Sequence, residues 1–187
     1  MGRLETVPAL FSPLGGGRLI IVSGWGSCLN CSTVAPSDPV GHTVFGLDAM
    51  KGTLSWAFST GCPVDTSPQI YKDAVLVAAC GSVYSLLASD GAKVNWVKVV
   101  ASAGEHITQV VVHSKLRSAY VCTDGGRVYG LSLVTGDTLW TWQRRDGDSG
   151  GELNIQVVSD SGRDAYVSST AGWVAKLLLP PITPLNL

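Results

Sequence analysis

The sequence has no long apolar run and little charge, and these absences exclude two classes of protein. A membrane-spanning helix needs about 18 consecutive apolar residues, whereas the longest candidates here, Leu19–Val22 and Val110–Val112, have the length of a strand. Charged residues make up 14% of the chain, the net charge is −1, and lysine and arginine are scattered singly except at Arg144–Arg145. Because no basic stripe is present, we expect no nucleic-acid partner, and we expect no membrane span.

Signals for export and a regular set of disulfides are also missing. The residues before Pro8 include an acid, Glu5, and contain no apolar core of a signal peptide. The five cysteines are an odd number, and their spacing does not resemble a disulfide framework. We therefore predict a cytoplasmic location and interpret Cys80 and Cys122 as small buried residues.

Motifs of common enzyme classes are absent too. The sequence contains no nucleophile elbow, phosphate-binding loop or dinucleotide fingerprint, and Gly15–Gly17 is interpreted as a turn. Several polar residues fall in expected loops, where a histidine beside carboxylates can do acid–base work, but their spacing favours solvated loop polarity. These residues are Glu105, His106, Arg144, Arg145, Asp146 and Asp148. No catalytic residue is predicted.

What the chain does have is an internal repeat. Hydrophobic residues make up 45% of the sequence, which is enough for a core. Three segments align with one another: Val44–Trp56, Val83–Trp96 and Val128–Trp140. Each reads as a short apolar strand, a turn with a glycine and a second strand that ends in tryptophan, and the tryptophans are 40 and 44 residues apart. A fourth copy begins at Trp173 and stops after Leu177.

Two further strands precede each copy, so the repeating unit has four. The first strand of each unit is expected to open at Ser12, Ser67, Thr108 or Asn154. The second is expected at Arg18–Ser23, Ala74–Ala79, Ser118–Thr123 and Asp164–Ser169. Four short strands at a period near 40 residues are typical of β-propeller blades. We predict an all-β partial propeller over residues 1–179, with blades at about 11–58, 66–100, 107–142 and 153–178, and a proline-rich tail over 180–187.

The glycine and the tryptophan of each copy have expected roles. The glycine supplies the positive φ that a tight hairpin needs. The tryptophan docks against the neighbouring blade, where burying the ring at about 25 cal/mol per Å² contributes several kcal/mol. The glycines are Gly52, Gly91 and Gly136, and the blade-docking tryptophans are Trp56, Trp96 and Trp140.

These segments resemble the PQQ-repeat, quinoprotein-dehydrogenase-like family, whose blade motif is approximately Ala-x-Asp-x-x-Thr-Gly-Lys-x-x-Trp. The first copy keeps the aspartate, glycine and tryptophan, as Asp48, Gly52 and Trp56. The third keeps the threonine, glycine and tryptophan, as Thr135, Gly136 and Trp140, and the middle copy keeps Gly91 and Trp96. The resemblance covers roughly residues 11–177 and implies a propeller of WD40-like blades.

The resemblance implies binding rather than catalysis. Quinoprotein dehydrogenases combine such blades with a vicinal Cys-Cys, a calcium site and a catalytic aspartate, and this sequence has no adjacent cysteine pair. It is more similar to non-catalytic members, such as the propeller of the bacterial outer-membrane assembly lipoprotein. The C-terminal propeller of β-alanine-activating, acyl-CoA-synthetase-like enzymes has segments similar to Gly61–Pro68 and Ala79–Tyr84. We expect a binding or scaffold module without PQQ or another cofactor; a fragment of a PQQ-dependent oxidoreductase is the alternative.

The repeats are too few for the family's rings, which resemble seven- or eight-bladed structures. The fourth copy runs into Pro180 and Pro181, which cannot donate to a strand ladder, and residue 1 falls where an earlier outer strand would end. Exposed blade edges tend to aggregate unless they are paired. We therefore expect a protein partner or self-association, such as two copies back to back, to complete the propeller.

A long loop in the first blade is the candidate binding site. An insertion falls within Gly26–His42, on the propeller face where ligands usually sit, whereas His113 is expected on the opposite face. The candidate partner-binding residues are Cys28, Asn30, Cys31, Asp38 and His42. Zinc prefers ligands such as Cys28, Cys31, His42 and Cys62. A single CxxC is weak evidence, so this set is a minor alternative and no metal is predicted.

Overall fold

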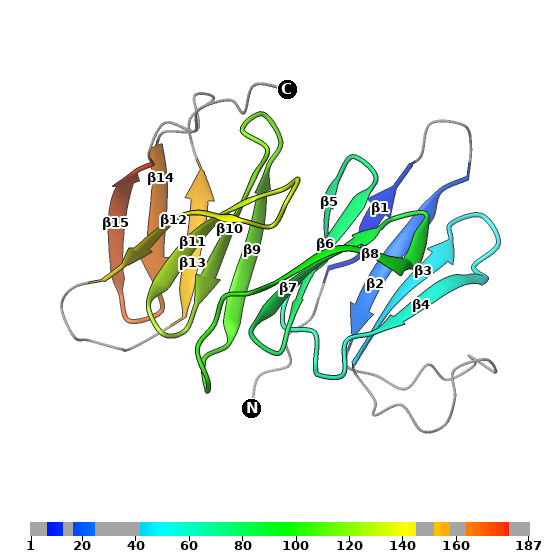
Figure 1. The fold of residues 1–187 in the computed structure, drawn as a ribbon, viewed down its shortest axis with the longest axis horizontal. Helices are drawn as coiled ribbons and strands as arrows, with labels where there is room; N and C mark the ends of the chain where they lie inside the picture. The colour runs from blue at the N-terminus through cyan, green and yellow to red at the C-terminus, as the bar shows by residue number, and fades with distance from the viewer. Residues whose placement is uncertain (1–6, 13–16, 25–41, 145–151, 158–163, 180–187) are drawn as a thin grey trace. The chain divides into compact units, whose positions relative to one another are not determined.

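The computed structural model describes residues 7–12, 17–24, 42–144, 152–157 and 164–179, and these residues form an all-β protein, as the sequence predicts. Four antiparallel sheets are present, and within each sheet the strands pair in chain order (Figure 1). This is the architecture of a partial β-propeller. No helix among these residues is long and apolar enough to cross a membrane.

The first two sheets belong to one compact unit, Met1–Val100. The first sheet contains β1 (Ala9–Phe11), β2 (Leu19–Gly24), β3 (Thr43–Asp48) and β4 (Leu54–Ser59). The second sheet contains β5 (Gln69–Tyr71), β6 (Ala74–Ala79), β7 (Ser82–Leu87) and β8 (Asp90–Val99).

The other two sheets belong to a second compact unit, Ala101–Leu187. The third sheet contains β9 (Ile107–His113), β10 (Ser118–Thr123), β11 (Arg127–Ser132) and β12 (Thr138–Gln143). The fourth sheet contains β13 (Leu153–Val157), β14 (Asp164–Ser169) and β15 (Trp173–Leu178). Within the described ranges, the fourth sheet therefore has three strands where the others have four.

The strand register places the repeat tryptophans at equivalent positions, each opposite a small residue. Trp56 pairs with Gly46, Trp96 with Ser85 and Trp140 with Gly130. The small residue is required because a Cβ on Gly46 or Gly130 would overlap the indole ring of its partner. The fourth sheet departs from the pattern, because the residue at this position of β15 is Lys176.

The core of the first unit lies between its two sheets. Trp56 is only 7% exposed, and its Nε1–H donates a hydrogen bond of 3.0 Å to the backbone oxygen of Ala88. Buried residues of both sheets surround it: Phe11, Ile21 and Val44 of the first sheet, and Val75, Val77, Leu86 and Ala88 of the second. Trp56 therefore docks one sheet on the next.

The core of the second unit has the same design between the third and fourth sheets. Trp140 packs on this core with its ring centroid 5.7 Å from that of Tyr120. The fourth sheet contributes the buried side chains of Leu153, Ile155, Ala165, Val167 and Leu177. The indole N–H of Trp140 is buried and has no hydrogen-bond partner among the described residues, in contrast to that of Trp56. Trp96 is half-buried, and its docking role stays a prediction.

The start of the first sheet corrects one sequence expectation. We expected the first strand to open at Ser12, but β1 ends at Phe11 and pairs with β2 through Ala9–Ile21 and Phe11–Leu19. Ser12 therefore follows the strand instead of opening it.

The glycine of the middle repeat corrects another. Gly52 and Gly136 have φ values of +67° and +76°, as expected, but Gly91 does not have a positive φ. Gly91 is buried, and a Cβ at this position would overlap the Trp56 ring. The middle repeat therefore keeps its glycine to make room for the tryptophan of the preceding sheet.

Candidate functional site

In three sheets, the segment before the first strand contacts the turn between the second and third strands, and we call this contact the joint of the sheet. The register explains it, because the start of an antiparallel strand lies beside the end of its partner. Ile107 pairs with Thr123, Leu153 with Ser169, and Val64 forms a bridge to Ala79. The residues just outside these pairs make the joints.

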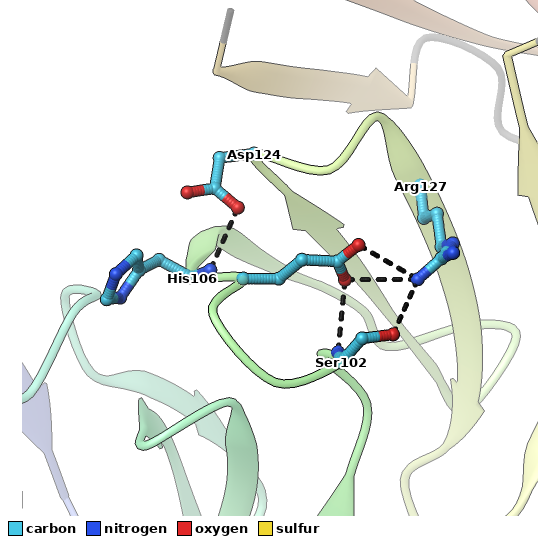
Figure 2. A network of polar contacts seen from close by, with 5 residues as sticks. Ser102, His106, Asp124 and Arg127 are labelled. Carbon is cyan, nitrogen blue, oxygen red and sulfur yellow. Dashed lines mark hydrogen bonds and ion pairs between the residues drawn. The ribbon is translucent and has the colours of Figure 1, made fainter. Parts of the chain in front are cut away.

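The joint of the third sheet is a reciprocal pair of hydrogen bonds between His106 and Asp124. The backbone N–H of His106 donates to Asp124 Oδ1 at 2.8 Å, and the backbone N–H of Asp124 donates to the His106 carbonyl at 3.1 Å. Figure 2 shows the first of these bonds, with the imidazole of His106 directed away from the network. The backbone of His106, rather than its ring, holds the loop in place.

An ion pair reinforces this joint. Arg127 Nη1 lies 2.9 Å from Glu105 Oε1 and 2.7 Å from the Ser102 hydroxyl, and the Ser102 N–H donates to Glu105 Oε2 at 3.1 Å (Figure 2). The two charged side chains are 30% and 18% exposed, so solvent screens the pair only in part. Glu105 lies directly on Gly125, where a Cβ would overlap the carboxylate.

The joint of the fourth sheet repeats the reciprocal pattern with a hydroxyl in place of the carboxylate. The backbone N–H of Glu152 donates to Thr170 Oγ1 at 3.0 Å, and the N–H of Thr170 donates to the Glu152 carbonyl at 3.1 Å. Glu152 therefore corresponds to His106, and Thr170 to Asp124.

The joint of the second sheet is covalent. Pro63 occupies the position of His106 and Glu152, and it has no N–H to donate. Instead Cys62, one residue earlier, forms a disulfide with Cys80, which occupies the position of Asp124; their Cα atoms are 5.6 Å apart, within the usual range for disulfides.

This disulfide corrects the interpretation of the cysteines. Cys80 is not a small buried residue, because it is exposed and bonded to Cys62. Cys122 is fully buried, as expected, and burial raises the pKa of its thiol to about 12. Cys62 is oxidised and offers no thiolate to zinc. Because Cys28 and Cys31 lie outside the described residues, their part of the zinc alternative stays untested.

The long loop of the first sheet is placed only at its end. It connects β2, which ends at Gly24, to β3, which begins at Thr43, and Cys28, Asn30, Cys31 and Asp38 lie outside the described residues. The carbonyl oxygen of His42 accepts a hydrogen bond of 2.8 Å from the N–H of the buried Thr60. The Thr60 hydroxyl lies 2.8 Å from the same oxygen and 2.6 Å from the Cys62 oxygen.

The remaining polar candidates are not assembled into one site. Arg145, Asp146 and Asp148 lie outside the described residues. The Arg144 guanidinium lies over the Trp173 ring at 4.5 Å, beside an open hollow of about 670 Å³ between β12 and β15. His113 is the last residue of β9, and its Nδ1 accepts a hydrogen bond from the Leu116 N–H in the following turn at 3.3 Å. In the described part of the chain, no three potential metal ligands are grouped together.

Two other polar side chains of the repeats, those of Asp48 and Tyr120, lie in a turn and in the core. Asp48, the motif aspartate, accepts hydrogen bonds from the N–H groups of Lys51 and Met50, which lower its pKa, and it thereby closes the β3–β4 turn. Burial raises the pKa of Tyr120 to about 12, so its hydroxyl stays protonated at neutral pH. These surroundings suit a turn and a core rather than acid–base chemistry.

Comparisons with known proteins support the fold and assign no family. No protein-family model matches the chain, and no curated protein matches it. Among solved structures, BamB from Moraxella catarrhalis is similar at a TM-score of 0.61 and 19% identity, over 87% of this chain and 46% of BamB. The computationally designed Ika4 protein is similar at 0.61 and 15% identity, over 96% of this chain and all of Ika4.

A quinohemoprotein alcohol dehydrogenase from Comamonas testosteroni is also similar, at a TM-score of 0.59 and 15% identity, over 89% of this chain and 30% of the enzyme. The chain thus spans less than half of BamB and of this enzyme. At such identities the likeness concerns the β-propeller fold alone.

Proposed function

We propose that this chain is a non-catalytic β-propeller module that binds a protein partner through its joint-bearing edges and functions within a larger assembly. The observation that carries the proposal is the joint itself, present in three sheets with three different chemistries. A joint holds a connecting loop against a turn, and loops held on a rigid scaffold are suited to recognition.

The use of the polar groups supports binding over catalysis. Three charged residues come together at the joint of the third sheet, namely Asp124, Glu105 and Arg127. Each of them makes a hydrogen bond or ion pair that holds the loop. An acid–base pair needs groups directed at a substrate position. At the joint of the third sheet, the exposed residues are instead Ser102, Ala103, Gly104 and His106, which lie in the connecting segment and its turn.

The outward face of the first sheet supports the assembly. Leu10, Ile20, Val22, Phe45 and Leu47 share this face, which we call the acceptor face. The register gives each an equivalent on the second sheet, namely Ile70, Val75, Val77, Tyr84 and Leu86, which pack in the core that contains Trp56. On the acceptor face Leu10 is 58% exposed. We propose that another propeller sheet covers this face.

A photocrosslinking amino acid placed at Ala103 tests the binding edge, because Ala103 is exposed beside the third joint. The matched control is the same amino acid at Ser114, an exposed residue in the turn between β9 and β10. We expect discrete protein adducts from position 103 in cells that express the chain, and none of them from position 114. Equal adducts from both positions, or adducts from 114 alone, would contradict a binding role for this edge.

The oxidoreductase alternative is tested with the same purified chain. We expect no dye reduction in the presence of PQQ, calcium and an alcohol, and no calcium requirement for folding. Saturable PQQ binding with alcohol-dependent turnover would overturn the non-catalytic proposal.

A further inference from the structure

The covalent joint of the second sheet differs from the other two in a way that has a chemical consequence. Hydrogen-bonded joints do not respond to thiols, whereas a disulfide can be opened by them. The three joints occupy equivalent positions in their sheets. The two hydrogen-bonded joints can therefore serve as internal controls for the effect of redox conditions on the disulfide joint.

The disulfide is reachable from solvent. Cys80 is exposed and Cys62 is half-buried, and both lie in loops rather than in the ladder of the sheet. Cys122, in contrast, is fully buried in β10. A small thiol therefore has access to the Cys80 sulfur and none to Cys122.

The backbone conformation of the β6–β7 turn does not explain why residue 80 is a cysteine. Cys80 and Gly81 connect β6 to β7 with φ values of +53° and +68°, the combination of a type I′ turn, in which asparagine and aspartate are favoured at the first position. A cysteine there is disfavoured for the turn alone. The bond to Cys62 gives the residue a role that the turn does not.

We propose that the Cys62–Cys80 disulfide is a reversible redox latch that fastens the segment between the first and second sheets to the β6–β7 turn. A small thiolate attacks the exposed Cys80 sulfur, and Cys62 leaves as a thiolate that takes up a proton. A second small thiol then displaces Cys80. Two small thiols thereby supply two electrons and two protons, and the products are two cysteine thiols and one small-molecule disulfide.

Opening the latch removes the covalent part of the joint, whereas other contacts between this segment and β6 remain. They include the Val64–Ala79 bridge, the hydrogen bond of 2.8 Å from the Asp65 N–H to the Ala78 carbonyl, and one of 3.3 Å from the Ala78 N–H to Thr66 Oγ1. Pro63 has no backbone N–H, so it cannot replace the lost contact with a hydrogen bond like those of His106 and Glu152. The segment 60–66 therefore loosens on reduction, while the joints at Asp124 and Thr170 stay closed. This inference is independent of whether the joint-bearing edges bind a partner.

The test uses the full chain with Cys28 and Cys31 changed to serine, so that three cysteines remain. Peptide mapping under non-reducing conditions is expected to show the Cys62–Cys80 bond. After mild reduction at neutral pH without denaturant, iodoacetamide is expected to label Cys62 and Cys80 but not Cys122. Three free thiols before reduction, or a bond that opens only in denaturant, would overturn the proposal.

Hydrogen–deuterium exchange of the oxidised and reduced forms then measures the loosening. We expect amides of residues 60–66 and 79–81 to exchange roughly tenfold faster or more after reduction, and oxidised glutathione to restore the slow rate. The peptides around Asp124 and Thr170 are the internal controls, and their exchange is expected to stay unchanged. Equal exchange in the two forms, a uniform increase along the chain, or failure to reoxidise would contradict a local, reversible latch.

Two variants reproduce the open latch without a reductant. Cys62→Ser removes the bond at the loop, and Cys80→Asn removes it at the turn while supplying a residue that the type I′ turn favours. Both are expected to show the fast exchange of the reduced protein with or without thiol. Slow exchange in either folded variant would show that the disulfide does not hold the segment.

Discussion

Trp56 shows most clearly how single residues hold this molecule together. Its ring occupies the space that Gly46 leaves in its own sheet and that Gly91 leaves in the next, and its N–H bonds to Ala88 of the second sheet. One side chain thus combines apolar burial with a buried hydrogen bond across two sheets. The two glycines are needed for this packing, because a Cβ at either position would overlap the Trp56 ring.

Replacement of Trp56 by alanine is expected to destabilise the protein by about 3–5 kcal/mol, as for other buried aromatic residues. The measurement is urea unfolding followed by circular dichroism. Trp56→Phe, which keeps most of the apolar surface but loses the bond to Ala88, is the companion variant and should cost less. A loss below about 1 kcal/mol for the alanine variant would mean that Trp56 does not dock the sheets.

The residue opposite each tryptophan supports a second prediction. Gly130→Ala forces a Cβ into the Trp140 ring, and such overpacking is expected to cost roughly 1–3 kcal/mol. Lys176→Ala, at the equivalent position of the fourth sheet, removes only the exposed ion pair with Asp164 and should change the free energy of unfolding by less than about 0.5 kcal/mol. Equal effects of the two substitutions would refute the requirement for a residue without a Cβ opposite Trp140.

At the scale of strands and loops, the repeat and its antiparallel sheets were predictable from sequence. Period-2 strands separated by glycine turns gave the four sheets, because a meander has few alternative pairings once the strands are known. The position of β1 was missed because the Ser-Pro pair at Ser12 was aligned with the one at Ser67, although the two lie on opposite sides of their strands.

The joints were not predicted, although the sequence contains a signal for one of them. Cys62 lies in the segment that leads to the first strand of its repeat and Cys80 lies just after the second strand, and antiparallel pairing at the Val64–Ala79 bridge brings the two cysteines together. Counting all five cysteines as one set concealed this pair. The hydrogen-bonded joints have no such signal, because His106 and Glu152 contribute only backbone atoms and thus carry no residue preference.

The reciprocal bonds predict equal effects at two joints. Asp124→Ala and Thr170→Val each remove the side-chain acceptor of one backbone N–H, and each is expected to cost about 1 kcal/mol. Exchange of the His106 amide should rise in the first variant, and that of the Glu152 amide in the second. Ser114→Ala, in a turn without a joint, is the control and should change neither. Unchanged exchange in both joint variants would contradict the assignment of these bonds.

At the scale of the whole molecule, the first and the fourth sheets differ in how well they are suited to pack against a further sheet. The acceptor face has the side chains that receive a tryptophan-bearing sheet elsewhere in the chain. The fourth sheet has Lys176, paired with Asp164, at the position where the earlier sheets have a small residue opposite a tryptophan. We expect the chain to associate through the acceptor face, so that a change on this face should alter the mass of the assembly.

The most direct test of this account is the mass of the purified chain in solution, measured by light scattering at micromolar concentration. Because the equivalent apolar faces of the second and fourth sheets are each packed in a core with the sheet before them, we predict a species larger than one chain. Leu10→Glu, which places a charge on the acceptor face, should shift the mass toward that of one chain, whereas Met50→Glu in an exposed turn should not. A stable monomer of the unmodified chain with a single sharp thermal transition would contradict the account.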